Sequence, residues 1–184
     1  MDKTKEQLYK LFAEILDYPS PSLAKSAGEL AGLLGILCAE AAEKMQDFVS
    51  FTMGQSTAVL EETYTRTFDI SPTTTLYVGY QLFGEDYKRG TFMARLQAEY
   101  KTCGFSCGCE LPDYLPALLR FATVSGDPEF VNPLVQEGIK PAVDKMEKAF
   151  QEPRNGYALA VSSLRLFLDQ ECRQLVEAGG LQHG

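Results

Sequence analysis

The densest group of residues able to do chemistry is the segment Glu-Leu-Pro-Asp-Tyr-Leu-Pro at positions 110–116. Proline fixes φ and lacks an N–H, so the two prolines suit the first turn of a helix or the loop before it. Asp113 could then accept hydrogen bonds from the free N–H groups of that turn, as an N-cap. Alternatively, the segment presents a rigid polar group beside apolar side chains. That arrangement suits holding a peptide better than breaking a bond.

Tyrosines are concentrated in the middle third of the chain, around this segment. Tyrosine has a large apolar body and one polar tip, which is typical of peptide-binding surfaces. The alternative is ordinary core packing with bonded hydroxyls. As a set beside residues 110–116, they favour a groove. These tyrosines are Tyr64, Tyr77, Tyr80, Tyr87, Tyr100 and Tyr114.

Three cysteines, Cys103, Cys107 and Cys109, lie within seven positions of one another. Three thiolates could bind zinc or another soft metal, with Cys38 or Cys172 as a fourth ligand. Their spacing contains no Cys-x-x-Cys pair, so incidental thiols are the favoured interpretation. A metal-binding or redox-responsive helical protein is the alternative function.

Catalytic motifs are absent from the sequence. The only histidine, His183, is second from the end of the sequence and is a poor candidate for the base of a nucleophilic site. No phosphate-binding or dinucleotide-binding glycine pattern occurs. Carboxylates are abundant, but their spacing singles out no acid–base pair and is typical of solvated helix faces. We therefore predict no catalytic residues and a protein that is not an enzyme.

Composition is ordinary for a soluble globular protein, and its acidic charge is compatible with a basic partner or merely keeps the protein soluble. The 184 residues are 45% hydrophobic and carry a net charge of −8, which argues against nucleic acid and anionic membranes as partners. No signal peptide or membrane-spanning run is visible. The five cysteines, an odd number, fit a reducing compartment. We expect one cytoplasmic domain over residues 1–184, its last few residues frayed.

Apolar periodicity is helical almost throughout, and no alternation of strands with helices occurs. The fold expected is an all-α bundle of roughly eight to ten helices. Thr4 with Gln7 resembles a capping box, and Ser20 and Ser56 are candidate N-caps. One apolar stripe comprises Leu8, Leu11, Phe12, Ile15 and Leu16.

Later segments continue this helical pattern. Residues 73–83 carry β propensity, but we predict a helix because no second strand is available to pair with them. A helix over residues 86–103 should stop at Gly104. Further helices are expected at 21–53 with a break near Gly32 or Gly35, at 113–125, at 128–150 with a kink or split at Pro133 and Pro141, and at 157–177 after a turn at 153–156.

Short motifs within residues 60–125 follow one another in a specific order and spacing. Together they resemble the nitrate reductase delta-subunit (NarJ-type) branch of the TorD/DmsD chaperones. The motifs are Tyr-Thr-Arg-Thr-Phe-Asp at 64–69, Ser-Pro at 71–72, Thr-Leu-Tyr at 75–77, Gly-Glu-Asp-Tyr-Lys-Arg-Gly at 84–90, Tyr100, Gly-Phe at 104–105 and the segment at 110–116.

This resemblance implies an all-helical cytoplasmic chaperone dedicated to one molybdenum enzyme, with no cofactor of its own. Such chaperones bind the twin-arginine or remnant leader of a catalytic subunit while molybdopterin cofactor is inserted. Nitrate reductase is the best-known client, and related branches serve other oxidoreductases. The expected partner is therefore a molybdopterin-dependent catalytic subunit, with no nucleic acid and no direct membrane insertion. The chain is expected to be a monomer or a helix-swapped dimer.

The resemblance also implies a leader-binding groove at residues 110–116, where Tyr114 stands in place of the family's usual histidine. An apolar groove suits the hydrophobic face of a helical leader. Carboxylates such as Asp69, Glu85, Asp86 and Asp113 could receive its arginines. The expected peptide-binding residues are Tyr64, Phe68, Asp69, Tyr77, Tyr80, Glu85, Leu111, Pro112, Asp113, Tyr114, Leu115 and Pro116.

Overall fold

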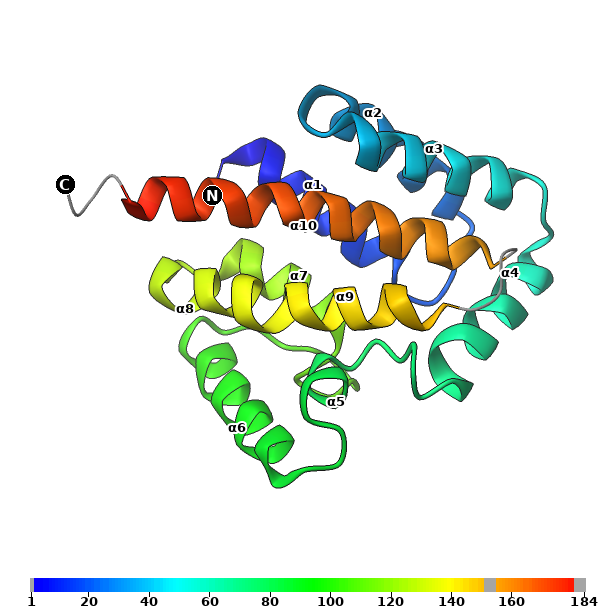
Figure 1. Ribbon diagram of the computed structural model, residues 1–184. Helices are drawn as coiled ribbons and strands as arrows, with labels where there is room; N and C mark the ends of the chain where they lie inside the picture. The colour runs from blue at the N-terminus through cyan, green and yellow to red at the C-terminus, as the bar shows by residue number, and fades with distance from the viewer. Residues whose placement is uncertain (1, 151–154, 181–184) are drawn as a thin grey trace.

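A computed structural model describes residues 2–150 and 155–180 of the chain, with side chains described up to residue 175. The regular elements of this part are all helical, as predicted (Figure 1). They are α1 (Lys3–Ile15), α2 (Leu23–Leu37), α3 (Ala39–Met53), α4 (Thr57–Tyr64), the π-helix η1 (Thr65–Ile70), α5 (Val78–Phe83), α6 (Tyr87–Thr102), α7 (Leu115–Val124), α8 (Pro128–Pro133), the π-helix η2 (Leu134–Ile139), α9 (Lys140–Ala149) and α10 (Gly156–Gly180).

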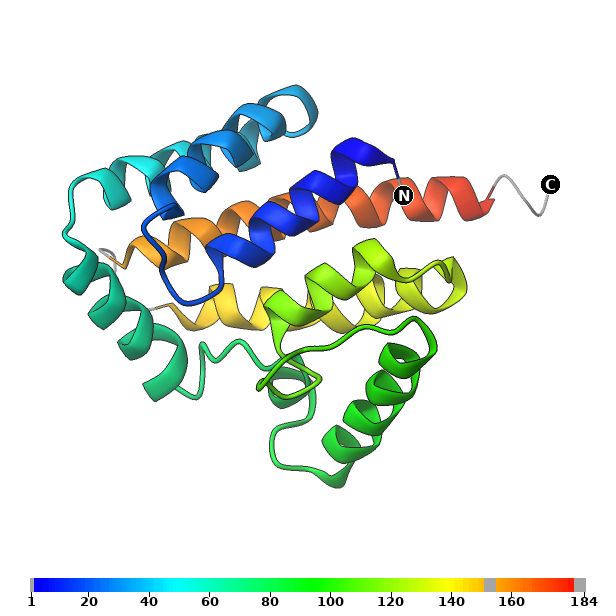
Figure 2. The same ribbon diagram turned by 180° about the vertical axis from the view of Figure 1, so that it is seen from behind.

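The long helix α10 runs through the middle of the molecule and organises its packing. It lies against α3 and α9, while α1 packs on α2 and α7 (Figures 1 and 2). The predicted apolar stripe of α1 is buried, including Leu16 just beyond the helix. Its rings meet α10 where Tyr9 and Phe12 lie 5.5 and 5.4 Å from Phe167, centroid to centroid. Burial of this apolar face holds the N-terminal helix in place.

The helix ends agree with the sequence only in part. Ser56 caps α4 as predicted, since its hydroxyl accepts from the N–H of Val59 at 3.4 Å. The capping box at Thr4 is wrong, because the carboxylate of Asp2 caps α1 and accepts from Thr4 N at 2.7 Å. A charged acceptor makes the stronger bond to these N–H groups. Ser20 is not an N-cap either, because α2 begins only at Leu23.

Glycines and prolines differ in how they shape the helices. The break predicted near Gly32 or Gly35 is wrong: both lie inside α2, and the chain turns at Cys38 instead. A single glycine lowers helix stability but does not stop a helix whose apolar face is buried. The predicted split near Pro133 and Pro141 is confirmed, because η2 separates α8 from α9. π-Turns of this kind accommodate an interrupted hydrogen-bond ladder.

Residues 73–83 are helical only in their second half, from Val78 onward. Before α5 the chain is paired in an isolated antiparallel bridge between Tyr77 and Tyr114. The N–H of Val78 donates to Asp113 O, and the N–H of Leu115 donates to Leu76 O, each at 2.8 Å. The pairing partner is therefore the 110–116 segment itself. The sequence could not reveal it because the bridge is one residue long on each side.

Two further boundaries follow from local chemistry. Gly104, with φ of +68°, terminates α6 as predicted, since left-handed backbone is accessible to glycine at little cost. Gly156 opens α10, and a Cβ there would lie 2.2 Å from the ring of Phe51. The close approach of α10 to α3 therefore requires glycine at this position. The predicted turn at 153–156 lies partly outside the described residues, and His183 and the predicted frayed tail lie wholly outside them.

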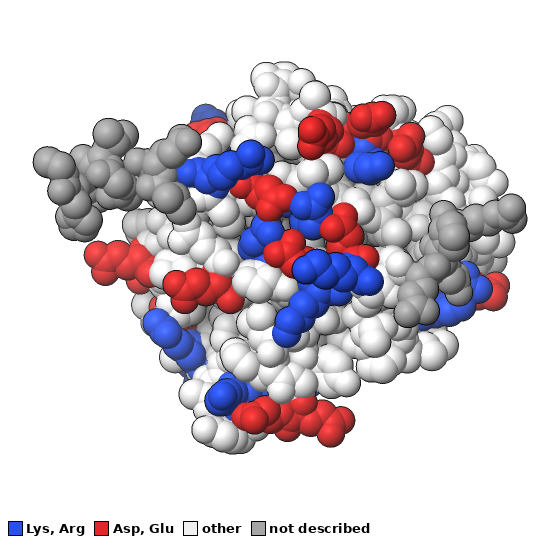
Figure 3. All heavy atoms as spheres, viewed as in Figure 1, with Lys and Arg blue, Asp and Glu red and all other residues white. Residues whose placement is uncertain are grey.

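Ion pairs join α9 to α10 on the face where Figure 3 shows basic and acidic side chains interleaved. Lys140 contacts Asp144 at 2.6 Å and Asp169 at 2.9 Å, and Arg165 contacts Asp169 at 2.5 Å. Such partly exposed networks add modest stability and fix orientation. Within the described ranges, no helix has both the length and the apolar character to cross a bilayer.

Candidate functional site

A pocket of about 210 Å³ lies where η1, residues 71–77, α5 and α6 meet. We call it the η1–α5 pocket. It brings together three of the residues predicted to bind a peptide, Asp69, Tyr77 and Tyr80. Its complete lining is Asp69, Ile70, Ser71, Pro72, Thr75, Tyr77, Tyr80 and Arg89.

The loop between η1 and α5 is held in place by hydrogen bonds to its own flanking elements. The amide nitrogen of Gln81 donates to the carbonyls of Thr73 at 3.1 Å and Thr75 at 2.9 Å. The buried hydroxyl of Thr74 donates to the carbonyl of Thr67 in η1. These bonds satisfy backbone groups of an irregular segment, so the loop presents its outer residues to the pocket in a defined arrangement.

Arg89 and Asp113 form an ion pair at the inner end of the pocket. Arg89 Nε lies 2.8 Å from Asp113 Oδ2, and Nη2 lies 3.4 Å from Oδ1. The carboxylate is fully buried, while the arginine side chain is 20% exposed. The N-cap interpretation of Asp113 is therefore wrong, because α7 begins at Leu115 without a side-chain cap. The stronger, charge-assisted partner has taken the carboxylate.

The guanidinium of Arg89 also lies over two tyrosine rings. Its central carbon is 5.5 Å from the ring centroid of Tyr77 and 5.7 Å from that of Tyr80. Cation–π contacts of this kind are strongest where water is partly excluded. The hydroxyl of Tyr77 donates to Glu110 Oε2 at 2.8 Å, and burial together with this bond raises the pKa of Tyr77 to about 12. Tyr77 is therefore a neutral hydrogen-bond donor at physiological pH.

Three of the predicted tyrosines form part of the scaffold. Tyr64, Tyr100 and Tyr114 are buried, and their hydroxyls are used inside the fold. The Tyr64 and Tyr114 hydroxyls are 3.0 Å apart, and Tyr114 also donates to Asp17 at 3.2 Å. Tyr100 donates to the carbonyl of Pro112 at 2.7 Å. Burial raises the pKa of each of these hydroxyls, so the core-packing interpretation holds for them.

The remaining predicted residues are scattered between core and surface. Leu111 is exposed at the edge of its loop, and Glu85 and Tyr87 are exposed beyond the pocket lining. Asp86 caps α6 and accepts from Lys88 N at 2.9 Å. The buried members of the predicted set that pack into the core are Phe68, Pro112, Leu115 and Pro116.

A second pocket, of about 430 Å³, shares Ile70 with the first, and we call it the α4 pocket. Tyr18 and Ile70 give it exposed apolar surface, and Glu61 and Glu62 give it negative charge. Its full lining is Tyr18, Ala58, Glu61, Glu62, Thr65, Arg66 and Ile70. No sequence motif marks this pocket, because Tyr18 and α4 meet only through the fold.

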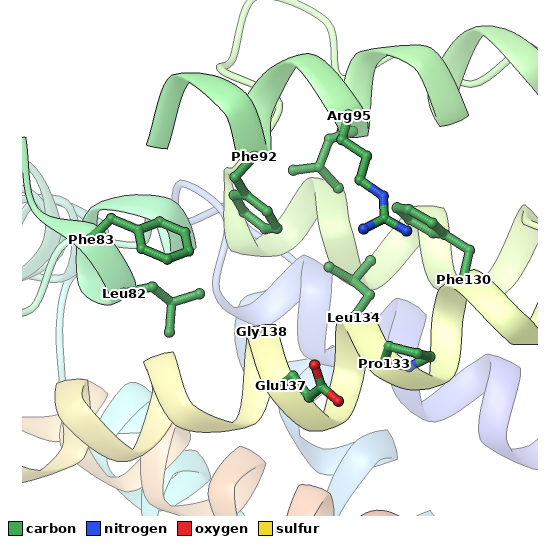
Figure 4. Close-up of a pocket in the computed structure, with 10 residues that line it drawn as sticks. Leu82, Phe83, Phe92, Arg95, Phe130, Pro133, Leu134, Glu137 and Gly138 are labelled. Atoms are coloured by element: carbon green, nitrogen blue, oxygen red, sulfur yellow. The ribbon is translucent and has the colours of Figure 1, made fainter. Parts of the chain in front are cut away.

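A third pocket, lined mainly by apolar and aromatic side chains, lies beside α5 (Figure 4). Figure 4 shows Phe83 and Phe92 lining one end, and Arg95 and Phe130 near the other. The guanidinium of Arg95 lies 5.2 Å from the centroid of the Phe130 ring. No sequence motif marked this pocket, since its walls come from α5, α6, α8 and η2. It is separate from the residues predicted to bind a peptide.

The cysteines behave as separate thiols. Cys103 and Cys109 are exposed, and the Cys107 thiol donates to the carbonyl of Glu110 at 3.2 Å. No three His, Cys, Asp or Glu side chains of the described residues are arranged to hold a metal ion. The alternative of a cysteine-cluster metal or redox protein therefore gains no support from this part of the chain.

Comparisons with known proteins agree with this helical scaffold and with the resemblance seen in the motifs. The sequence model of the nitrate reductase delta subunit family matches residues 36–158. The chain belongs to that family. Its fold resembles the crystal structure of a redox enzyme maturation protein from Archaeoglobus fulgidus, with a TM-score of 0.60, 24% identity, and coverage of 92% of this chain and 96% of the other.

Two curated relatives carry names that describe assembly rather than catalysis. The nitrate reductase molybdenum cofactor assembly chaperone NarJ of Bacillus subtilis (strain 168) is 38% identical over 84 residues, which is 45% of this chain and 46% of the relative. The corresponding chaperone NarW of Escherichia coli (strain K12) is 28% identical over 122 residues, 66% of this chain and 51% of the relative. The matches thus span about half the length of these relatives. Both relatives are named as assembly chaperones, which agrees with the prediction that this chain is not an enzyme.

Proposed function

We propose that this protein is a cytoplasmic chaperone for the catalytic subunit of a molybdopterin-dependent oxidoreductase such as nitrate reductase. It binds the N-terminal leader of that subunit, either an intact twin-arginine signal or a retained remnant. While bound, it assists cofactor insertion and delays export or membrane docking. Support comes from membership of the nitrate reductase delta subunit family and from relatives named as assembly chaperones.

The observation that carries the proposal is the composition of the η1–α5 pocket. Asp69 is exposed there and makes no hydrogen bond or ion pair with another described residue. The ring of Tyr80 lines the same pocket, and Ile70 and Pro72 add apolar surface. A carboxylate beside an aromatic face and apolar side chains suits an arginine followed by apolar residues. A leader peptide has this chemistry.

The α4 pocket extends this surface in a direction that an elongated peptide could follow. Ile70, 71% exposed, lies between the two pockets, and Tyr18, 53% exposed, lies beyond it. Glu61 and Glu62 add negative charge at that end. The apolar part of the leader would cover Ile70 and Tyr18. Its basic residues would lie near the carboxylates of Asp69, Glu61 and Glu62. Burying exposed apolar side chains supplies affinity, and opposite charge supplies orientation and a faster encounter.

The overall charge of −8 favours the same kind of ligand. A basic peptide approaches an acidic protein faster than a neutral peptide does, and salt weakens this attraction. Binding should therefore weaken as ionic strength rises. Apolar contacts would retain part of the affinity at high salt.

Affinity purification of the tagged protein from its own host during anaerobic respiration tests the proposal. We expect one molybdopterin-type catalytic subunit in near-stoichiometric yield, identified by mass spectrometry. Deleting the leader from that subunit should abolish its recovery, while deleting an equal length at its C-terminus serves as the control. Recovery that does not depend on the leader would contradict leader binding. Recovery of no such subunit would contradict the chaperone role.

A further inference from the structure

The environment of Arg89 has every component of a binding site for a guanidinium group. The buried Asp113 carboxylate faces its edge through two N–O contacts of 2.8 and 3.4 Å. The central carbon of the guanidinium lies over the Tyr77 and Tyr80 rings, 5.5 and 5.7 Å from their centroids. Planar, forked recognition by a carboxylate together with aromatic stacking distinguishes arginine from lysine. The chain thus holds one of its own arginines in a site that an incoming arginine would fit.

We propose that Arg89 is an internal stand-in for a leader arginine and that leader binding proceeds by exchange of one guanidinium for the other. The leader arginine takes the place of Arg89 beside Tyr77 and Tyr80 and pairs with Asp113. Arg89 swings outward. The inference rests on the proposed function and adds to it a gate built into the site, with arginine as the required ligand group.

Exchange avoids the main energetic obstacle to opening a buried ion pair. Breaking such a pair is costly because it leaves an uncompensated charge in the interior. Here Asp113 keeps a guanidinium partner before and after exchange. Arg89 is 20% exposed and itself lines the η1–α5 pocket, so a guanidinium entering that pocket meets Arg89 directly. The side chain of Arg89 can therefore leave along the open side without passing through the core.

The gate also makes recognition depend on two parts of the ligand. Arg89 is tethered beside its site, so its effective concentration exceeds that of any free arginine. A ligand arginine can displace Arg89 only if contacts made elsewhere by the same peptide, such as those over Ile70, contribute binding free energy. Free arginine and isolated basic peptides should therefore leave Arg89 in place. A lysine leader should also fail, because an ammonium group cannot reproduce the fork or the stacking.

NMR of the ¹⁵N-labelled full chain tests the exchange directly. The Nε–H of Arg89 is a reporter because its hydrogen bond to Asp113 protects it, and its signal is assigned by through-bond correlations in a ¹³C,¹⁵N-labelled sample of the parent chain. The probe is an unlabelled synthetic peptide with two adjacent arginines followed by an apolar helical segment. The control probe carries lysines in place of the arginines. Backbone amide shifts report binding, and the Arg89 Nε–H signal reports exchange.

The expected result is amide shifts around the η1–α5 pocket together with loss of the protected Arg89 Nε–H signal, with the arginine peptide alone. Amide shifts without any change at Arg89 would overturn the exchange and leave leader binding standing. Displacement of Arg89 by the lysine peptide would overturn the requirement for arginine. Absence of amide shifts with both peptides would overturn the proposed function and the exchange with it.

Affinity of a variant provides a second test. Arg89→Lys keeps a positive charge near Asp113 but weakens the internal competitor, so more of the protein is competent to bind. Because apparent affinity scales with the competent fraction, the arginine peptide should bind about tenfold more tightly. The matched control is Arg95→Lys in the same helix. Arg95 stacks on Phe130, and this variant should bind the arginine peptide as tightly as the parent protein does. Unchanged or weaker binding by folded Arg89→Lys would overturn the gate, and the NMR test decides if that variant does not fold.

Discussion

Gly79 lies directly against the carboxylate of Asp113: a Cβ added at residue 79 would sit 2.7 Å from Asp113 Oδ2. The same Cβ would lie 3.0 Å from Arg89 Cγ and 3.1 Å from the Phe92 ring. Val78, the preceding residue, is hydrogen-bonded through its N–H to the carbonyl of Asp113 at 2.8 Å. The first turn of α5 can therefore approach the buried ion pair only because residue 79 has no side chain.

Gly79→Ala should destabilise the protein, because the added methyl group must displace the Asp113 carboxylate or the ring of Phe92. Overpacking a well-filled interior typically costs about 1–3 kcal/mol, and we expect a loss of that size in the free energy of unfolding. Urea denaturation followed by circular dichroism measures it. The same variant should also broaden the Arg89 Nε–H signal, since the ion pair loses its geometry.

Gly28→Ala is the matched control for this prediction. Gly28 lies within α2, and no atom comes within 4 Å of a Cβ placed there. Alanine at such a helix position should raise stability by up to about 1 kcal/mol relative to glycine. Equal effects of the two substitutions would show that the Gly79 contact with Asp113 does not constrain the fold.

The fold was accessible from sequence because its strongest signal is local. Helical periodicity identified the stripe that includes Leu8 and Phe12, and Ser56 was recognisable as a cap from its position alone. The wrong predictions concern helix ends, where neighbouring groups compete for the same position. Asp2 displaced Thr4 as the cap of α1, and Cys38 rather than a glycine marked the turn after α2. Sequence spacing does not rank such competitors, because their energies differ by about 1 kcal/mol or less.

Most side chains of the candidate site could be predicted from sequence, including the buried Asp113. The sequence predicts Asp69 and Tyr80 as binding residues, and the structure brings them to one pocket. It does not single out Arg89, which lies in a recognised motif 24 positions from Asp113, because the partner of Arg89 depends on how α6 packs beside the 110–116 segment. Asp113→Ala, a natural choice from sequence for testing peptide binding, would also leave Arg89 without its buried partner. Loss of binding in that variant would therefore mix two causes.

A hydrogen-bonded pair of tyrosines, Tyr64 and Tyr114, offers a direct test of the scaffold. Their hydroxyls are 3.0 Å apart, with Leu16 O 3.1 Å from the Tyr64 hydroxyl and Asp17 Oδ1 3.2 Å from the Tyr114 hydroxyl, so two hydroxyl protons are shared among three contacts. Tyr114→Phe should lower the free energy of unfolding by about 1–2 kcal/mol, because partners of the lost hydroxyl remain partly buried. Tyr64→Phe should have a similar cost. Additive losses in the double variant, measured by urea denaturation, would argue against coupling between the two hydroxyls.

Peptide affinity should depend on the side chains that line the η1–α5 pocket. Asp69→Asn removes the pocket's unpaired carboxylate, and Tyr80→Ala removes one aromatic face. Because hydrogen bonds to charged groups contribute about 1.5–3 kcal/mol, Asp69→Asn should weaken binding of the arginine peptide roughly tenfold or more by calorimetry. Asp47→Asn, an equal change of charge on the exposed surface of α3, is the control and should bind normally. Comparable losses in Asp47→Asn and Asp69→Asn would indicate that only overall charge matters.

Alkaline conditions should destabilise the protein through its buried tyrosines. Burial raises the pKa of Tyr64, Tyr100, Tyr114 and Tyr157, and it raises the pKa of Tyr77 from the ordinary tyrosine value of 10.0 to about 12. Below pH 10 the tyrosine hydroxyls keep their protons in both the folded and the unfolded protein, so they leave stability unaffected. Above pH 10 the unfolded chain loses these protons first, and the free energy of unfolding must therefore fall as pH rises. The contribution of Tyr77 to this fall ends at about pH 12. Urea unfolding between pH 9 and pH 12 measures how steeply the free energy of unfolding falls with pH.

Tyr157→Phe should make this fall less steep and cost little stability at neutral pH, because the buried Tyr157 hydroxyl has no hydrogen-bond partner among the described residues. An unchanged slope in Tyr157→Phe would contradict a contribution from this hydroxyl.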